Sequence, residues 1–218
     1  MDKAIRYIAI EGVIGAGKTT LAKKLAEKLN AKLILEKFEE NPFLPKFYED
    51  PERFAFHTQI TFLLSRYKQL LDLQQEDLFY DYIISDYIFE KDKIFAYLNL
   101  QNDELQLYEK IVSFIEKNIR KPDLIIYLQS TVERLMANIK HRDREYEREM
   151  REDYISDLNE GYNYFFFRYK GTKLMVVNAT EIDFVNNGRD FEDLVSEILK
   201  PEHTSIEYFN PSIKRAAK

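Results

Sequence analysis

Residues 12–20 read Gly12-Val13-Ile14-Gly15-Ala16-Gly17-Lys18-Thr19-Thr20 and follow the apolar run Tyr7-Ile8-Ala9-Ile10. Glycines at this spacing before a Lys-Thr pair match the phosphate-binding loop pattern at every required position. They let successive backbone N–H groups turn inward around phosphate oxygens, and the helix that follows aims the positive end of its dipole at them. We therefore expect residues 12–20 to bind a nucleoside triphosphate, with Lys18 at its β- and γ-phosphates and Thr19 on Mg²⁺. An ordinary glycine-containing turn would leave Lys18 and Thr19 unexplained.

The composition suits one α/β domain that acts on a small molecule. With 218 residues, 45% of them hydrophobic, the chain can build one sizeable core but not two. Its net charge of −6 argues against a dedicated nucleic-acid surface, and the absence of cysteine excludes disulfides and thiolate sites. The first residues lack the apolar core of a signal peptide, and no stretch has membrane-spanning length. These features predict a cytoplasmic protein with no nucleic-acid or membrane partner.

Short β-branched runs alternate with longer amphipathic segments along the chain. This alternation is typical of an α/β fold in which helices cover both faces of a parallel sheet. The five expected strands are residues 5–10, 32–35, 82–85, 124–128 and 173–177. The expected helices are residues 18–29, 51–73, 105–119, 132–140, 154–169 and 191–199. We expect one domain over residues 1–200, followed by a polar, loosely held tail over residues 201–218.

Acidic residues close the second and third predicted strands. Glu36 comes directly after the second strand, and open α/β sheets bind ligands at the carboxyl ends of their strands. It can take a proton from a substrate hydroxyl that attacks the γ-phosphate. Its alternative role is a solvated acid, as expected of Glu39 and Glu40.

Asp86 closes the third strand, where a carboxylate orients Mg²⁺, so Thr19 and Asp86 form the predicted magnesium site. The alternative role of Asp86 is a helix N-cap.

A segment at about residues 138–152 is rich in basic residues. Its cations alternate with glutamates and are Lys140, Arg142, Arg144, Arg148 and Arg151. Such a cluster can close over phosphates as a lid, because the planar guanidinium donates paired bonds to phosphoryl oxygens and neutralises transition-state charge. The alternative is an exposed helix laced with Glu/Arg pairs. The phosphate-binding loop elsewhere in the chain favours the lid.

An aromatic-rich predicted helix carries two polar side chains on one face. Gln59 and Arg66 are seven residues apart, which places them on nearly the same side of a helix among phenylalanines. Apolar walls with two polar groups can hold a nucleobase, since phenylalanine stacks on the flat ring and an amide offers both a donor and an acceptor. The alternative is a core helix in which the backbone satisfies Gln59. His57, in the same helix, receives no catalytic role.

Taken together, these segments resemble the deoxyribonucleoside kinase family, whose members transfer the γ-phosphate of ATP to the 5′-hydroxyl of a deoxynucleoside. The resemblance covers most of residues 5–199 and includes Tyr48-Glu49-Asp50-Pro51-Glu52-Arg53-Phe54 and Asn178-Ala179-Thr180-Glu181-Ile182-Asp183-Phe184. It implies a P-loop kinase fold with ATP and Mg²⁺ as cofactors. It also implies that Glu36 is the general base and that Arg142 and Arg144 contact the phosphates.

For the nucleoside, the resemblance implies that Tyr48 and Glu147 hold the 3′-hydroxyl. Gln59 would bond the nucleobase, with Arg66 and Asp92 beside it. The expected substrate-binding residues are therefore Glu36, Tyr48, Gln59, Arg66, Asp86, Asp92 and Glu147.

At two positions the chain departs from the family pattern. The family commonly has arginine directly after the strand-end acid, where it steadies the base and the transferring phosphate, but this chain has Tyr87. Lys91 or Arg66 can substitute for that arginine. The family lid often begins with arginine four residues before Arg142, where this chain has Asn138, so its lid has fewer cations.

The expected substrate is a purine deoxynucleoside. The segment Glu39-Glu40-Asn41-Pro42-Phe43 is most similar to bacterial members that act on deoxyadenosine or deoxyguanosine. Members are typically homodimers built through helices, and the aromatic stretch at residues 162–169 offers apolar surface for that contact, with burial against the sheet as the alternative.

Two other kinds of protein share the phosphate-binding loop. A nucleoside monophosphate kinase, similar to thymidylate kinase, also has a lid but must accept a charged phosphate. Glu36 would repel that phosphate, whereas beside a neutral hydroxyl it is the base the reaction needs. A regulatory switch of the GTPase type is the other alternative, but the chain has no Asn-Lys-x-Asp guanine motif.

Overall fold

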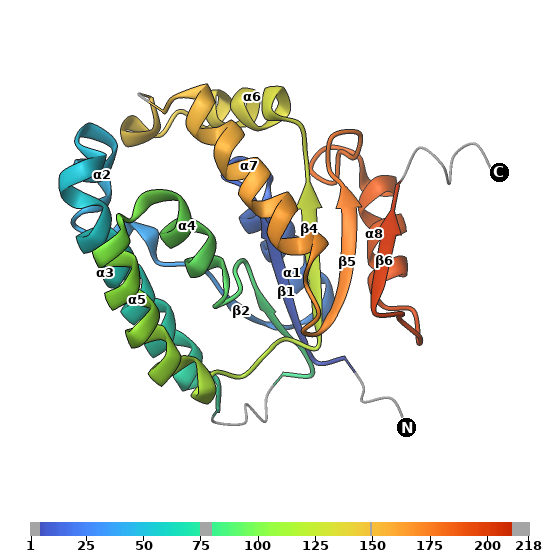
Figure 1. The fold of residues 1–218 in the computed structure, drawn as a ribbon. Coiled ribbons are helices and arrows are strands. Elements are labelled where there is room, and N and C mark those ends of the chain that lie inside the picture. The colour runs from blue at the N-terminus through green and yellow to red at the C-terminus, as the bar shows by residue number, and fades with distance from the viewer. Residues whose placement is uncertain (1–4, 75–79, 149, 211–218) are drawn as a thin grey trace.

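A parallel β-sheet forms the centre of the molecule (Figure 1). The computed structural model describes residues 5–74, 80–148 and 150–210. Over these residues it has six strands in the order β2-β3-β1-β4-β5-β6, and every neighbouring pair is parallel. The strands are β1 (Tyr7–Gly12), β2 (Lys32–Ile34), β3 (Ile83–Ser85), β4 (Leu124–Gln129), β5 (Lys173–Asn178) and β6 (Ile206–Phe209). The predicted α/β fold is confirmed, but the prediction of five strands is wrong.

The additional strand, β6, lies in the segment that was expected to be a loosely held tail. It pairs with β5 from Leu174 opposite Ile206 to Val177 opposite Phe209. The four-residue strand is too short to show a clear period-two pattern, and its pairing partner is what makes it a strand. Within the predicted tail, residues 211–218 lie outside the described residues.

Substitution of Phe209 tests whether β6 is part of the folded core. Phe209 is 4% exposed, whereas its neighbour Tyr208 is 76% exposed. We expect Phe209→Ala to lower the free energy of unfolding by about 3 kcal/mol, the usual loss for a buried phenylalanine. Tyr208→Ala should change it by less than about 0.5 kcal/mol. Urea unfolding followed by circular dichroism measures both, and equal values for the two variants would contradict the docking of β6.

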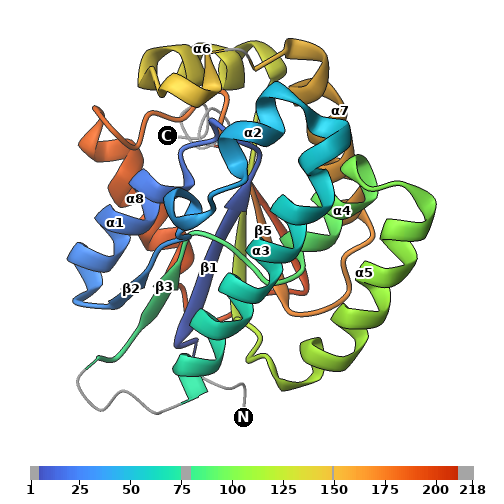
Figure 2. The same ribbon diagram turned by 90° about the vertical axis from the view of Figure 1, so that its left-hand side faces the viewer.

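Helices cover both faces of the sheet. They are α1 (Lys18–Leu29), α2 (Leu44–Glu49), α3 (Pro51–Leu71), α4 (Lys91–Asn99), α5 (Asn102–Ile115), α6 (Val132–Arg142), α7 (Glu152–Phe167) and α8 (Gly188–Ile198). Figure 2 shows α1 and α8 on one side of the sheet and α4, α5 and α7 on the other, with α3 packed against α4 and α5. Within the described part of the chain, no helix is both long and apolar enough to cross a bilayer.

The six predicted helices are present, with ends shifted by a few residues, and the described residues form two further α-helices that were not predicted. The long helix α3 begins where a proline and a capping acid predict a start, since the side chain of Asp50 accepts a hydrogen bond from the backbone N–H of Arg53 at 3.3 Å. The missed helices α2 and α4 have six and nine residues. Such short helices carry little periodicity and depend on packing against their neighbours.

The order of the strands places a crevice above β1 and β3. From β1 the chain passes to β2 and β3 on one side, and then crosses to β4 on the other side of β1. Open α/β sheets bind ligands at the carboxyl ends of strands where the direction of winding reverses in this way. Residues that directly follow β1, β2 and β3 therefore meet at one edge of the sheet.

Candidate active site

The loop after β1 has the backbone geometry that its glycines predict. Gly15 and Gly17 have φ values of 88° and 92°, in the left-handed region. A Cβ atom on Gly15 would lie 2.6 Å from the carbonyl oxygen of Leu135, and one on Gly17 would lie 2.9 Å from Cζ of Phe184. The loop leads directly into α1, whose first turn contains no acidic residue. The positive end of this helix is thus left for an anion.

Lys18, the first residue of α1, reaches back over the loop. Its Nζ donates a hydrogen bond to the carbonyl oxygen of Val13 at 3.0 Å. Burial lowers the pKa of Lys18 to about 8, and repulsion from Lys91 adds to this effect, while nearby carboxylates oppose it. Anionic phosphate at the loop would favour the charged form of this ammonium group.

Asp86, directly after β3, connects the start of α1 with the segment after β2. Thr19 donates its hydroxyl to Oδ2 of Asp86 at 2.6 Å, and the backbone N–H of Glu36 donates to Oδ1 at 2.7 Å. The predicted magnesium residues Thr19 and Asp86 are therefore in contact, and their hydroxyl and carboxylate oxygens are the hard ligands that Mg²⁺ prefers. The N-cap alternative for Asp86 is wrong, because the next helix, α4, has Glu90 at its N-cap.

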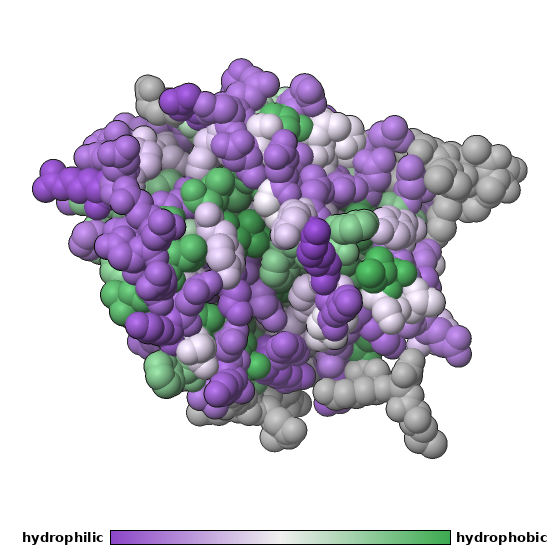
Figure 3. Space-filling view, in the orientation of Figure 1, coloured by the Kyte–Doolittle hydropathy of each residue, from purple (hydrophilic) through white to green (hydrophobic). Residues whose placement is uncertain are grey.

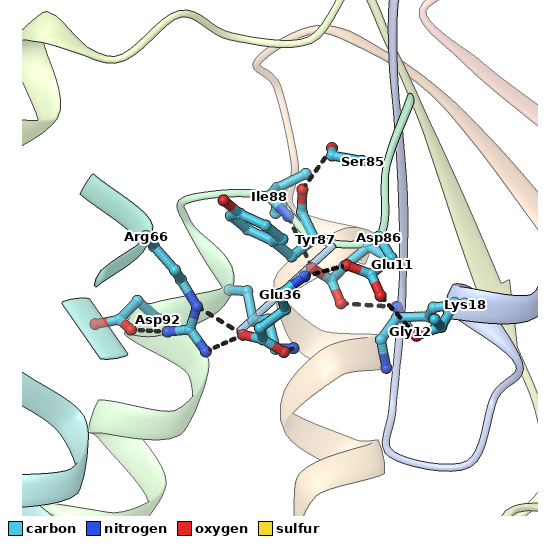
Figure 4. A network of polar contacts seen from close by, with 12 residues as sticks. Glu11, Gly12, Lys18, Glu36, Arg66, Ser85, Asp86, Tyr87, Ile88 and Asp92 are labelled. Atoms are coloured by element: carbon cyan, nitrogen blue, oxygen red, sulfur yellow. Dashed lines mark hydrogen bonds and ion pairs between the residues drawn. The ribbon is translucent and has the colours of Figure 1, made fainter. Parts of the chain in front are cut away.

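Glu36 lies among cations rather than in solvent (Figure 4). Its Oε1 accepts hydrogen bonds from Nε and Nη2 of Arg66 at 2.8 and 2.5 Å, and its Oε2 accepts one from Nζ of Lys91 at 2.7 Å. Burial by itself would raise the pKa of the Glu36 carboxyl, but Lys91 and Arg66 outweigh burial and hold that pKa well below its usual range. Glu36 is therefore ionised, as a proton acceptor must be, whereas Glu39 and Glu40 are exposed as expected.

Arg66 bridges two carboxylates in the helical layer. Figure 4 shows its guanidinium between Glu36 and Asp92, and its Nη1 pairs with Oδ1 of Asp92. Asp92 is fully buried, and its Oδ2 has no partner in the described part of the chain. Gln59 donates its amide N–H to the backbone carbonyl of Asp92 at 2.8 Å, while its Oε1 makes no bond among the described residues. The backbone thus satisfies only one end of this amide.

The segment predicted as a lid divides into two parts. Arg142 donates to Oε2 of the buried Glu147 from Nε at 3.0 Å, and Nη1 of Arg144 lies 3.5 Å from Oε1 of the same carboxylate. Arg148 and Arg151 instead form exposed pairs with neighbouring aspartates. An exposed helix laced with Glu/Arg pairs therefore does not describe the segment, because the exposed arginines pair with aspartates and the two arginines that pair with a glutamate share a buried one.

Tyr48, at the end of α2, faces the same lid segment. Its ring stacks on Tyr146 with centroids 6.1 Å apart and an interplanar angle of 14°. Burial raises the pKa of Tyr48 well above its ordinary value, and Tyr154 and Glu147 add to the shift. The hydroxyl is therefore neutral and can donate or accept a hydrogen bond.

One cavity brings the predicted residues together. Its lining includes Lys18, Thr19, Glu36, Tyr48, Gln59, Arg66, Asp86, Arg142, Arg144 and Glu147. Asp92 is absent from the lining and contacts the cavity through Arg66. The phenylalanine expected beside Gln59 is Phe62, one helical turn after it, whereas sequence reasoning missed the lining residue Phe95.

The two departures from the family pattern have structural partners. Tyr87 is buried, and its hydroxyl donates a hydrogen bond to Oε1 of Gln69 at 3.1 Å, so it takes no part in holding Glu36. Asn138, in α6, donates its amide N–H to the carbonyl oxygen of Gly15 at 2.8 Å. The start of the predicted lid is thereby attached to the phosphate-binding loop by a neutral hydrogen bond rather than by an additional cation.

Glu11 is a buried acid that sequence reasoning did not single out. It lies on β1 and accepts hydrogen bonds from the backbone N–H groups of Gly12 at 2.9 Å and Ile88 at 3.1 Å, and from the Tyr162 hydroxyl at 3.2 Å. Burial raises the pKa of Glu11. These contacts join the phosphate-binding loop to the segment after β3, which identifies a structural role.

A phosphate-binding loop beside a half-buried, ionised carboxylate defines a phosphoryl-transfer enzyme of the P-loop class. Residues 8–202 match the profile of the deoxynucleoside kinase family. The chain therefore belongs to the deoxynucleoside kinase family, as the sequence predicted, and is a kinase that phosphorylates nucleosides.

Curated relatives match over nearly the whole chain. Deoxyguanosine kinase of Bacillus subtilis (strain 168) is 34% identical over 197 residues, which are 88% of this chain and 95% of the relative. Deoxyadenosine/deoxycytidine kinase of the same organism is 29% identical over 206 residues, covering 90% of this chain and 93% of the relative. The solved structure of deoxyadenosine kinase from M. mycoides with dCMP and dCDP has a TM-score of 0.79 and 28% identity, covering 88% of this chain and 98% of that one.

Proposed function

We propose that this kinase transfers the γ-phosphate of ATP to the 5′-hydroxyl of a purine deoxyribonucleoside, giving the 5′-monophosphate and ADP. The observation that carries this proposal is the link between acid and phosphate loop. Asp86 accepts hydrogen bonds from the backbone N–H of Glu36 at 2.7 Å and from the Thr19 hydroxyl at 2.6 Å, and Lys18 and Glu36 line one cavity. An ionised carboxylate that shares a cavity with the phosphate-loop residues Lys18 and Thr19 suits a neutral hydroxyl acceptor.

In the proposed mechanism, Lys18 and the backbone N–H groups of the loop bind the β- and γ-phosphates. Thr19 and Asp86 would hold Mg²⁺, which supplies charge neutralisation at the phosphates when bound. The proton of the 5′-hydroxyl passes to Glu36 as the 5′-oxygen bonds to the γ-phosphorus and the bond to the bridging oxygen of ADP breaks. Arg142 and Arg144 stabilise the charge that develops on the transferred phosphoryl group.

The nucleoside side of the cavity supports the remaining roles. Tyr48 and Glu147 are proposed to hold the 3′-hydroxyl, in line with their place in the cavity lining. Gln59 would bond the base with its free Oε1, between the aromatic walls of Phe62 and Phe95. We propose that Asp92 acts through Arg66, because it pairs with that side chain without lining the cavity.

The reaction can be tested directly. Purified protein, labelled ATP and Mg²⁺ are incubated with a panel of four deoxynucleosides and their monophosphates, and the labelled product is identified. We expect label on deoxynucleosides only. Label on monophosphates alone would contradict the acceptor, because Glu36 would then face a phosphate, and hydrolysis of the nucleotide with no labelled acceptor would indicate a switch protein.

Gln59→Ala tests the base site. We expect deoxyadenosine or deoxyguanosine to give the highest kcat/KM. For the best substrate, the variant should lower kcat/KM by an amount equivalent to roughly 1–3 kcal/mol of transition-state binding, the cost of one unpaired buried polar group. Gln106→Ala, which changes an exposed glutamine of α5, is the matched control and should leave kcat/KM unchanged. If thymidine or deoxycytidine exceeds both purines by tenfold, the purine assignment is wrong and the kinase assignment stands.

We also propose that the protein is a homodimer. Along the aromatic stretch of α7, Tyr162 and Phe166 are buried, whereas Tyr164 and Phe167 are 63% and 81% exposed. The face shown in Figure 3 is largely hydrophilic, with hydrophobic side chains in separate patches. Sedimentation velocity would give the mass, and replacement of Phe167 by Asp should favour the monomer if α7 forms the contact. The cytoplasmic location stays a prediction from the sequence.

A further inference from the structure

The two oxygens of the Glu36 carboxylate are held unequally. A carboxylate offers about four lone-pair positions, two on each oxygen. Two N–H groups of Arg66 occupy Oε1, at 2.8 and 2.5 Å, whereas Oε2 accepts one hydrogen bond, from Lys91 at 2.7 Å. The backbone N–H of Glu36 is engaged separately, by Asp86. A further donor, such as an approaching hydroxyl, therefore finds its place on Oε2, the oxygen that Lys91 holds.

Lys91 forms its ion pair with Glu36, and its charge also acts on the buried Glu11 and on Lys18. Arg66 divides its guanidinium between Glu36 and Asp92. Among the described residues, the ammonium group of Lys91 forms an ion pair with Glu36 only, beside the ring of Phe95 at 5.6 Å from the centroid. Lys91 is 5% exposed, and a charge so far removed from water remains in place only with a paired partner.

No other side chain at this position supplies the same contact. Tyr87 directly follows Asp86, but its hydroxyl bonds Gln69 and it carries no positive charge. Arg66 is bound to Oε1, and Lys18, a third cation near the carboxylate, turns to the carbonyl of Val13 in the phosphate loop. Lys91 comes from the first turn of α4, so this helix delivers the cation to Oε2.

We infer that Lys91 is a positioning residue for phosphoryl transfer, which fixes Oε2 of Glu36 toward the acceptor hydroxyl. Lys91 holds the Glu36 carboxylate from α4, in a chain that has Tyr87 rather than arginine after Asp86. The inference rests on the proposed function, since it requires Glu36 to be the proton acceptor. Without Lys91, the carboxylate keeps its contact with Arg66 but loses the constraint on the reacting oxygen.

Substitution of Lys91 separates positioning from binding. We expect Lys91→Met to lower kcat on the order of 10²-fold, the effect of misplacing a reacting group by about 1 Å, with little change in KM for the nucleoside. The kcat of Lys91→Arg should be at least about tenfold higher than that of Lys91→Met, since the guanidinium keeps the ion pair with Glu36. Lys93→Met is the matched control, because Lys93 lies on the same helix and pairs with Glu116 at 2.5 Å away from the cavity. It should leave both constants unchanged.

A double-mutant cycle with Glu36→Gln is the deciding experiment. If Lys91 acts through Glu36, adding Lys91→Met to Glu36→Gln should lower kcat by less than about threefold further. The inference is overturned if Lys91→Met alone has wild-type kcat, or if its full effect persists in the Glu36→Gln background. Thermal unfolding of each variant checks the fold, and Lys91→Gln replaces Lys91→Met in the cycle should the latter fail to fold. Wild-type kcat in Glu36→Gln would instead overturn the proposed role of Glu36 as base.

Discussion

Lys18→Ala is expected to abolish phosphoryl transfer, with kcat reduced by at least about 10²- to 10³-fold, the loss that follows removal of one preorganised donor from a transition state. The ammonium group lies at the start of α1 over the phosphate loop, bonded to Val13 at 3.0 Å. Its removal leaves the β- and γ-phosphates without their fixed counter-charge as negative charge moves onto the leaving oxygen. Labelled ATP with the best deoxynucleoside measures the rate.

A nearby lysine provides the control for this variant. Lys23 is an exposed residue of the same helix, and Lys23→Ala should retain wild-type kcat and KM. Circular dichroism of both variants establishes that the fold is intact. Wild-type turnover by Lys18→Ala would contradict the assignment of residues 12–20 as the loop that binds the phosphates, and with it the proposed orientation of ATP.

Glu36→Gln should lower kcat by about 10²-fold or more, the span usual for loss of a general base. Glutamine keeps the shape of the side chain, but an amide cannot accept the proton of the 5′-hydroxyl. Nucleoside affinity should change little, because the contacts proposed for the sugar and the base come from α2, α3 and the lid segment. Steady-state kinetics with the nucleoside varied at saturating ATP separates kcat from KM.

The matched control is Glu39→Gln, an exposed acid in the same acidic segment. Its kinetic constants should equal those of the wild type. A rise in KM for Glu36→Gln with unchanged kcat would make Glu36 a binding residue, and another group would then have to accept the proton.

Local sequence patterns were sufficient where one segment contains the whole signal. Residues 12–20 predicted a phosphate-binding loop, and the loop has left-handed glycines at positions 15 and 17 followed by α1 at Lys18. Acids after apolar runs predicted Glu36 and Asp86 at the carboxyl ends of neighbouring strands, where they are joined by a hydrogen bond of 2.7 Å. Parallel strands bring their carboxyl ends to one edge, so these positions follow from strand order and need little tertiary detail.

The side-chain partners within the helical layer could be identified only from the tertiary structure. The sequence placed Gln59 and Arg66 on one face of α3, but one of the two acidic partners of Arg66 is Asp92, from a helix that was not predicted. Lys91 and Arg66 were the two candidates to replace an arginine at position 87. Both contact Glu36, Lys91 through Oε2 and Arg66 through Oε1. Lysine and arginine side chains are long and flexible, so their partners depend on how α3 and α4 pack together.

From its sequence alone, this chain can be recognised as a P-loop kinase of the deoxynucleoside kinase family, because the phosphate loop and the strand-end acids are local patterns with defined spacing. The strand β6 and the helix α4 could not be found in this way, since a four-residue strand and a nine-residue helix are stabilised by their neighbours rather than by their own periodicity. The contact of Lys91 with Oε2 of Glu36 likewise arises only when α4 packs over the crevice, because these residues are 55 positions apart and meet through the tertiary structure.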